Sequence, residues 1–340
     1  MNEQKAARPG STWESLNRGL EKVGLSPLSV AGFLLLCLAP VIINNEYMLR
    51  LGVISLLFGT LAMGFGLSAG YISVANWGYA GLMGLGSYVS ALLLINLGVN
   101  PWIGIFIGAA ASGLMGLLIG ILTLRMSGMY AGLLAWFLGL TLMALAAGLQ
   151  PLTRGSLGLN VPLFFNTAWS RPYFYAMLAI CFGVFVALRI VVRSHYGLAF
   201  IALGQDMEAA RAAGVSPLKY KVINFTISCF IAGLCGGFYA HFIGILTPAL
   251  MSTRHCLEIL VIAYIGGRGS IWGPLFAAFL IVPVFESMNA LLELKYIIYG
   301  LTLILVMIFY PKGLSGLWDS LVRVCKSRLS QRGGAQATKE

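Results

Sequence analysis

The sequence predicts an all-α fold, a polytopic membrane helix bundle of about ten transmembrane helices with both termini in the cytoplasm. Composition is the first observation, because 59% of the 340 residues are hydrophobic and 10% are charged, whereas an ordinary soluble domain has about 25% charged residues. The second is that apolar runs recur along the whole chain, each suited to a hydrocarbon core of roughly 30 Å. A soluble all-α protein is a poor second interpretation, since it could not bury so many uninterrupted runs.

The apolar runs divide the chain into three regions. A polar tail over 1–27 mixes basic and acidic residues and is not followed by an apolar core with a cleavage site, so it is not a secretory signal. A transmembrane domain covers 28–311, and a basic cytoplasmic tail covers 312–340. The predicted spans are 28–44, 47–67, 79–97, 101–124, 128–149, 172–193, 222–245, 256–267, 274–292 and 295–311.

Basic residues set the orientation of this layout. With the N-terminus inside, 17 of the 22 Lys and Arg residues fall on the cytoplasmic side and five fall outside, as the positive-inside rule requires. The rule also accounts for the net charge of +11, so no nucleic-acid partner is expected and the lipid bilayer is the environment. The short span 256–267 is kept as a crossing, because a re-entrant turn there would move the basic C-terminal tail outside.

The sequence shows no sign of catalysis. It has no GxxxxGK[ST] phosphate loop, and GFGLSAG at 64–70 follows a membrane helix rather than a strand, so it is not a nucleotide loop. The six cysteines and three histidines have no metal-ligand spacing. We therefore expect neither enzyme activity nor a bound cofactor or metal in this chain.

Two glycine-rich stretches interrupt the apolar pattern, SVANWGYAG at 73–81 and GGRGSIWGP at 266–274. Paired breaks of this kind occur where discontinuous helices line a substrate path, although both stretches could equally be simple interhelical turns. The candidate path residues are Asn76, Trp77, Gly78, Tyr79, Gly266, Gly267, Ser270, Trp272 and Gly273.

A polar segment at 194–221 lies on the predicted cytoplasmic side. Within it, Glu208-Ala209-Ala210 favours helix, Gly214 suits a helix end, and Pro217 prevents continuation. A short helix over 205–213 is therefore predicted, with small and polar faces suited to docking against another protein. A solvated loop is the alternative. The candidate docking residues are Asp206, Glu208, Ala209, Ala210 and Gly214.

The E-A-A-x-x-x-G pattern in this segment resembles the coupling loop of ATP-binding-cassette (ABC) importer permeases. Three blocks, at 194–240, 265–288 and 299–317, resemble the branched-chain amino-acid permease family more specifically. The resemblance implies a permease subunit in a bacterial or archaeal plasma membrane. It also implies three kinds of partner: two cytoplasmic ABC ATPases that bind ATP and Mg, a second homologous permease, and a periplasmic or extracellular substrate-binding protein.

The resemblance extends to the predicted outer loop at 150–171. LTRGSLGL at 152–159 is similar to a Leu-Thr-Gly-Gly-x-x-Gly-Leu loop that would face the binding protein, through Thr153, Gly155 and Gly158. Arg154 stands where that family has glycine. In the first half Val74, Asn76 and Tyr79 replace the expected Gln, Ser and His. This departure leaves the substrate open between branched-chain amino acids, related amino acids, urea and short amides.

A stand-alone secondary transporter or channel for a small polar solute is the rival function. It would explain the glycine-broken helices, but it needs ion-coupling residues inside the membrane. The predicted central spans are nearly free of charged residues, which counts against it.

Overall fold

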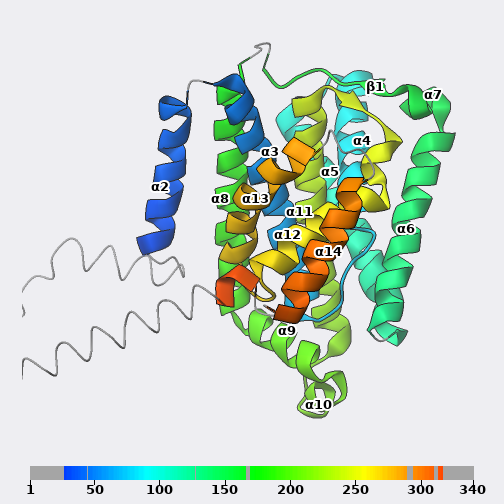
Figure 1. Ribbon diagram of the computed structural model, residues 1–340. Coiled ribbons are helices and arrows are strands. Elements are labelled where there is room, and N and C mark those ends of the chain that lie inside the picture. The colour runs from blue at the N-terminus through cyan, green and yellow to red at the C-terminus, as the bar shows by residue number, and fades with distance from the viewer. Residues whose placement is uncertain are drawn as a thin grey trace, which may run out of the picture.

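Each of the ten predicted apolar ranges contains a helix in the computed structural model, and these helices form one bundle (Figure 1). The structure describes residues 27–43, 45–126, 128–165, 169–288, 294–309 and 313–316. The predicted tails 1–27 and 312–340 lie outside the described residues, apart from Pro27 and 313–316. Within the described part, seven stretches are long and apolar enough to cross a membrane. An all-α polytopic bundle is therefore confirmed.

The elements follow in chain order. The helices are α2 (Pro27–Ile42), α3 (Glu46–Gly66), α4 (Tyr79–Leu97), α5 (Pro101–Leu122), α6 (Met129–Gly148), α7 (Gln150–Thr153), α8 (Arg171–Arg193), α9 (His195–Gln205), α10 (Met207–Ala212), α11 (Pro217–Ile243), α12 (Thr253–Gly266), α13 (Trp272–Ser287) and α14 (Leu294–Phe309). Single tight turns are η1 (Leu67–Tyr71, a π-helix), η2 (Thr123–Arg125), η3 (Gly155–Leu157) and η4 (Pro248–Met251). Two-residue strands are β1 (Leu159–Asn160) and β2 (Ile245–Leu246).

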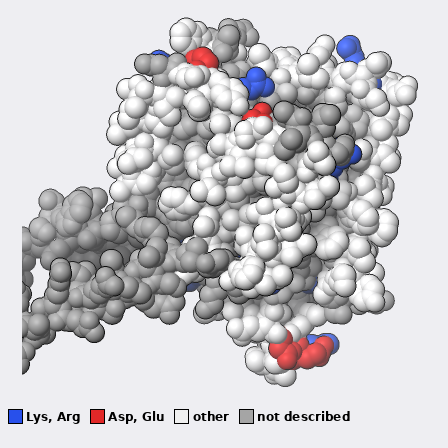
Figure 2. Space-filling model, viewed as in Figure 1, with Lys and Arg blue, Asp and Glu red and all other residues white. Residues whose placement is uncertain are grey.

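The two ends of the bundle differ, and we name them by the elements that they carry. α9 and α10 lie at the α10 end, at the bottom of Figure 1, whereas β1 and α7 lie at the β1 end, at the top. β1 pairs antiparallel with β2, with Leu159 opposite Leu246, so the loop after α6 is fastened to the chain leaving α11. Figure 2 shows a surface that is uncharged over most of the face in view.

Glycine allows α4, α5 and α11 to pack closely at the centre of the bundle. A Cβ atom on Gly108 of α5 would lie 2.5 Å from the carbonyl oxygen of Gly86 in α4, and one on Gly116 would lie 2.6 Å from the Cβ of Cys229 in α11. Gly104 and Gly120, each four residues from one of these glycines, pack against Ser90 and Val222. Small residues let membrane helices approach to backbone contact, and here they join three helices.

Buried hydroxyl groups fix the register of these helices. Ser87 Oγ donates to the carbonyl oxygen of Gly236 at 2.7 Å, and Ser112 Oγ donates to that of Leu82 at 2.9 Å. His241 of α11 contacts Ser90 Oγ at 2.9 Å through Nε2 and the Pro162 carbonyl oxygen at 3.0 Å through Nδ1. These four side chains thus find protein partners away from water, as a membrane interior requires.

Candidate functional site

α10 is a short helix whose start is fixed by its own sequence. Asp206, in extended conformation, accepts hydrogen bonds through Oδ1 from the backbone N–H groups of Glu208 at 2.9 Å and Ala209 at 3.0 Å. This N-cap satisfies two donors that have no partner within a helix. The predicted helix over 205–213 is therefore present, with regular bounds Met207–Ala212.

The end of α10 is fixed by Gly214. Its φ of +85° is a left-handed conformation that glycine adopts without a Cβ clash. The next amide, of Val215, then donates back to the carbonyl oxygen of Ala210 at 3.0 Å. Ala210 is 6% exposed and Ala209 is exposed, so Ala210 serves packing and Gly214 serves chain reversal.

Pro217 does not lie in a loop, contrary to the sequence interpretation. It is the first residue of α11, where a missing N–H is tolerated because no partner exists there. α11 therefore begins five residues before the predicted span at 222, and segment 194–221 also contains α9, which the sequence interpretation missed. As a result, α10 is joined to a 27-residue helix through the centre of the bundle by only a few residues.

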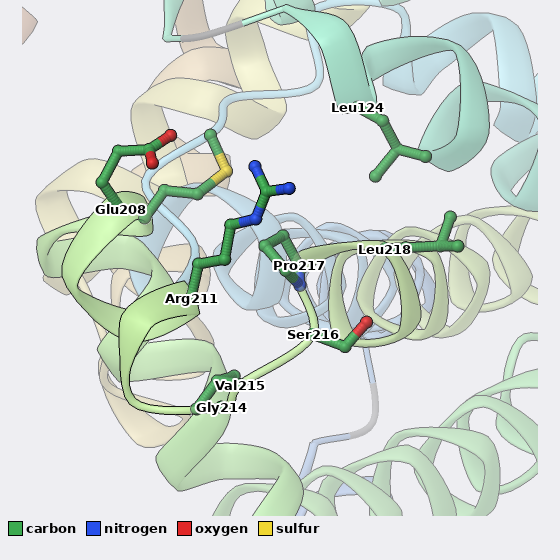
Figure 3. A pocket seen from close by; sticks show the side chains of 9 residues that line it. Leu124, Glu208, Arg211, Gly214, Val215, Ser216, Pro217 and Leu218 are labelled. Carbon is green, nitrogen blue, oxygen red and sulfur yellow. The ribbon is translucent and has the colours of Figure 1, made fainter.

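α10 and its N-cap residue present charged side chains to the surface. Asp206, Glu208 and Arg211 are exposed, and Figure 2 shows acidic and basic side chains gathered at the tip. A cavity of about 440 Å³ lies beside α10, between Glu208, Arg211, Pro217, Leu218 and Leu124. In Figure 3, Leu124 of η2 and Leu218 of α11 approach this space from the right, and Arg211 reaches it from α10. Leu124 is a contributor that the sequence did not indicate.

The first glycine-rich stretch forms non-helical backbone inside the bundle. The chain leaves η1 at the α10 end and reaches Asn76, which is fully buried, near the midpoint of α11, where Asn76 Nδ2 donates to Cys229 Sγ at 3.5 Å. Asn76 Oδ1 accepts from the Gly78 N–H at 3.1 Å, and the buried Tyr79 donates to the Ser228 carbonyl oxygen at 3.0 Å. α4 therefore begins within the bundle.

A second non-helical segment, which the sequence interpretation missed, meets the first. After β2 the chain turns back from the β1 end through η4, and α12 begins at Thr253, whose Oγ1 accepts from Trp136 Nε1 of α6 at 2.9 Å. The Sγ atom of Cys256 lies 3.9 Å from the Asn76 carbonyl oxygen. Pro248 and the polar run Ser252-Thr253-Arg254-His255 were the available signal. Non-helical backbone at this depth is tolerated only inside protein or beside a water-filled cavity.

The residues predicted to line a substrate path differ in their burial. Asn76, Gly78 and Tyr79 are buried, whereas Trp77 is 39% exposed and lies near Gly132 of α6. α12 adds a pair of ionisable side chains close to its start, with His255 Nδ1 3.1 Å from Glu258 Oε2. The second predicted stretch, at 266–274, is the connection between α12 and α13 instead.

That connection is a tight turn packed by small residues. Gly266 and Gly273 are in backbone contact, Gly267 has a φ of +110°, and Ser270 Oγ accepts from the Gly273 N–H at 3.0 Å. The Trp272 ring contacts those of Phe33 in α2 and Phe185 in α8 at tilted angles, on the left of Figure 1, while Trp77 lies near Gly132 of α6, the helix on the right. The two Trp-Gly pairs therefore do not converge.

The predicted outer loop is ordered by Thr153 at the β1 end. Its Oγ1 donates to the Ala146 carbonyl oxygen at 2.6 Å and accepts from the Gly155 N–H at 3.2 Å. Gly155 and Gly158 have φ values of +54° and +83°. Arg154 adopts a φ of +57°, which explains physically why a similar loop would have glycine at this position.

Membrane-length helices, mid-depth non-helical segments and a capped helix projecting at one end define a multi-pass membrane transport protein. The profile of the family described as "Branched-chain amino acid transport system / permease component" matches residues 47–307. The chain belongs to this family of permease components.

Individual relatives agree with this assignment. The chain is 27% identical over 293 residues to the high-affinity branched-chain amino acid transport system permease protein LivM of Salmonella typhimurium, covering 78% of this chain and 69% of LivM. It is 26% identical over 285 residues to LivH of the same organism, covering 76% and 91%. The fructose import permease protein FrcC of Rhizobium meliloti is 26% identical over 261 residues, covering 72% and 69%. No solved structure matches the chain.

Proposed function

We propose that this permease works as one of two transmembrane subunits of an ABC importer, and that it carries branched-chain or related amino acids. The observation that carries the proposal is α10. It projects from one end of the bundle (Figure 1), is capped at both termini by its own residues, and is joined almost directly to the central helix. A helix of this kind is suited to receive a force from a partner and to pass it on.

The expected route of that force runs along α11. Ser228 of α11 donates to the Gly64 carbonyl oxygen of α3 at 2.7 Å, and Asn224 Nδ2 donates to that of Leu67 at 2.9 Å, at the π-helical turn. Cys229, on the same helix, contacts Asn76. When partner ATPases move α10, α11 would therefore shift the end of α3 and the non-helical segment together.

The partners follow from this arrangement. The α10 end faces the cytoplasm and meets two ABC ATPases, which bind ATP and Mg and supply the energy. The β1 end, with Thr153, Gly155 and Gly158, faces an extracytoplasmic substrate-binding protein. Similarity to both LivM and LivH supports pairing with a second homologous permease. The membrane is the plasma membrane of a bacterium or archaeon, with both termini inside.

The substrate is argued from the relatives and from the buried centre. LivM and LivH are named for branched-chain amino acid transport, and FrcC is named for fructose. The non-helical segments are lined chiefly by buried apolar or uncharged residues such as Val74, Asn76, Tyr79 and Met251, which suits an aliphatic solute better than a sugar. Urea and short amides remain the alternative substrates within the same class.

Uptake by the complete transporter tests the coupling role of α10. Glu208→Lys reverses an exposed charge on α10 and leaves the caps intact, so uptake should fall about tenfold or more, with the chain still folded and inserted. Arg193→Gln is the matched control, an exposed charge at the same end on α8. Unchanged uptake in Glu208→Lys would remove the coupling role. Mild-detergent purification, with mass spectrometry, should recover an ATPase and a second permease.

The His255–Glu258 pair favours a second candidate, a secondary transporter driven by an ion gradient. Ionisable pairs inside a membrane bundle serve as proton relays in such proteins. Purified chain in proteoliposomes, without ATPases, separates the two functions. Uptake driven by a proton gradient alone would establish the secondary transporter, and uptake that requires ATPases and ATP would exclude it.

A further inference from the structure

A second cavity, of about 240 Å³, lies at the α10 end, between the start of the first non-helical segment and α10. One wall is the start of the non-helical segment, Ser73 and Val74. The opposite wall is the junction of α9 and α10, Gly204 and Met207. The first turns of α11 close the third side. The cavity therefore lies where the start of the first non-helical segment meets the elements of the α10 end.

Lys221 of α11 is the charged residue that lines this cavity. Lys221 is only 3% exposed. Its Nζ atom donates hydrogen bonds to the carbonyl oxygens of Thr123 at 2.6 Å and Met126 at 3.3 Å. These carbonyl groups lie at the end of α5 and η2, where a helix attracts positive charge. An ammonium group has three protons to donate, so two are used and one is left for a further acceptor.

The cavity offers no opposite charge to this lysine. None of the described residues that line it is acidic, and most are aliphatic, methionine, proline or glycine. A buried charge normally has a partner of opposite charge, because carbonyl dipoles replace only part of the lost hydration. The environment thus contains a fixed ammonium group, a small apolar space and no anion.

We propose that this cavity is a cytoplasmic exit site, in which Lys221 binds the carboxylate of a transported aliphatic solute before release. The proposal rests on the proposed function, since it takes the solute to be an amino acid. The apolar lining accepts the aliphatic side chain, and Lys221 recognises the carboxylate by a charge-assisted hydrogen bond. Urea, amides and sugars lack a carboxylate, so this site would favour amino acids over those solutes.

The position of the site also links release to the energy source. Gly204 packs in backbone contact with Tyr71, so the α9–α10 junction and the chain entering the non-helical segment are in direct contact beside this cavity. Ser73 has a φ of +59°, an uncommon conformation for a residue with a side chain. Displacement of α10 would therefore change the cavity and release the solute.

Binding to the membrane complex in nanodiscs, without substrate-binding protein, tests the site. The probes are leucine, 4-methylpentanoate, which keeps the carboxylate without the amino group, and 4-methylpentanamide, which lacks the charge. Equilibrium dialysis should show binding of both acids and about tenfold weaker binding of the amide. Lys221→Gln should weaken binding of both acids, and Lys221→Arg should retain it. Lys219→Gln, two residues earlier and exposed, is the matched control.

Two results would overturn the exit site: equal binding of acid and amide to the wild-type complex, or acid binding that survives Lys221→Gln. The comparison of acid and amide needs no variant, so it decides the matter even if Lys221→Gln does not fold. Failure of the wild-type complex to import leucine with ATP would reject the proposed substrate alone. Preference for 4-methylpentanoate over its amide, lost in Lys221→Gln, would still establish the carboxylate site in that case.

Discussion

The hydroxyl group of Tyr71 donates to the carbonyl oxygen of Gly269 at 2.7 Å. Tyr71 ends the π-helical turn before the first glycine-rich stretch, and Gly269 lies in the second, nearly 200 residues later. Gly70 makes the approach possible, since a Cβ there would lie 2.6 Å from the Gly269 amide nitrogen. The π-helical turn that leads into the first stretch therefore contacts the second stretch at the α10 end, although the tryptophan residues of the two stretches lie apart.

Tyr71→Phe removes this hydrogen bond and leaves the rest of the ring in place. The free energy of unfolding should fall by about 1 kcal/mol, because a buried hydrogen bond is lost. Thermal unfolding of the purified permease measures the change, with Tyr47→Phe, whose side chain is exposed, as the control. Equal thermal unfolding midpoints for Tyr71→Phe and Tyr47→Phe would mean that the hydrogen bond from Tyr71 to Gly269 does not stabilise the fold.

Asp206→Ala should weaken α10 by about 1 kcal/mol, because two backbone amides lose their N-cap acceptor. Hydrogen exchange of 207–212 should become faster, and ATP-driven uptake should fall with it. Asp206→Asn keeps an acceptor oxygen and should behave almost like the wild type. If uptake followed the negative charge instead, so that Asn was as poor as Ala, the cap would not be the function of this residue.

Arg154→Gly should stabilise the loop at the β1 end by about 0.5–1 kcal/mol, because glycine adopts a φ of +57° without a Cβ clash. Gly158→Ala introduces the opposite problem at a φ of +83° and should destabilise the loop. Thermal midpoints of the two variants should therefore move in opposite directions. A lower midpoint for Arg154→Gly would show that the arginine side chain stabilises the loop more than its backbone strains it.

Gly78→Ala should prevent α4 from seating against α6, because the added Cβ would overlap the carbonyl oxygen of Ala135. We expect little folded protein in the membrane, measured by the yield of monodisperse material after solubilisation. Gly148→Ala is the control, since that position of α6 has open space for a Cβ. Normal yield from Gly78→Ala would require α4 and α6 to be farther apart than described.

Local sequence patterns predicted the features that depend on local chemistry. Asp206, Gly214 and the alanines between them fix α10 because capping and left-handed φ values involve residues a few positions apart. The ten apolar ranges were predicted for the same reason. Thr153 and Gly155 also form a locally bonded loop, within the segment expected.

Long-range relationships could not be predicted in this way. Pro217 was assigned to a loop because proline both ends one helix and begins another, and only the fold shows which applies. The non-helical segment before α12 looked like part of an ordinary connection, since its depth depends on contacts with Trp136 and Asn76, more than a hundred residues away. The burial of Lys221 likewise depends on the carbonyl oxygens of Thr123 and Met126, which are distant in the sequence.

The sequence by itself determined an all-α membrane bundle, its apolar helices and the capped helix α10, because hydrophobic length and capping are properties of adjacent residues. Only the tertiary structure decided which segments meet at mid-depth, that Trp77 and Trp272 lie apart, and that Lys221 faces a cavity without an acid. The physical reason is that the contacts between distant segments depend on the shapes of the packed helices and on how closely their backbones approach. Neither property can be derived from a single stretch of sequence.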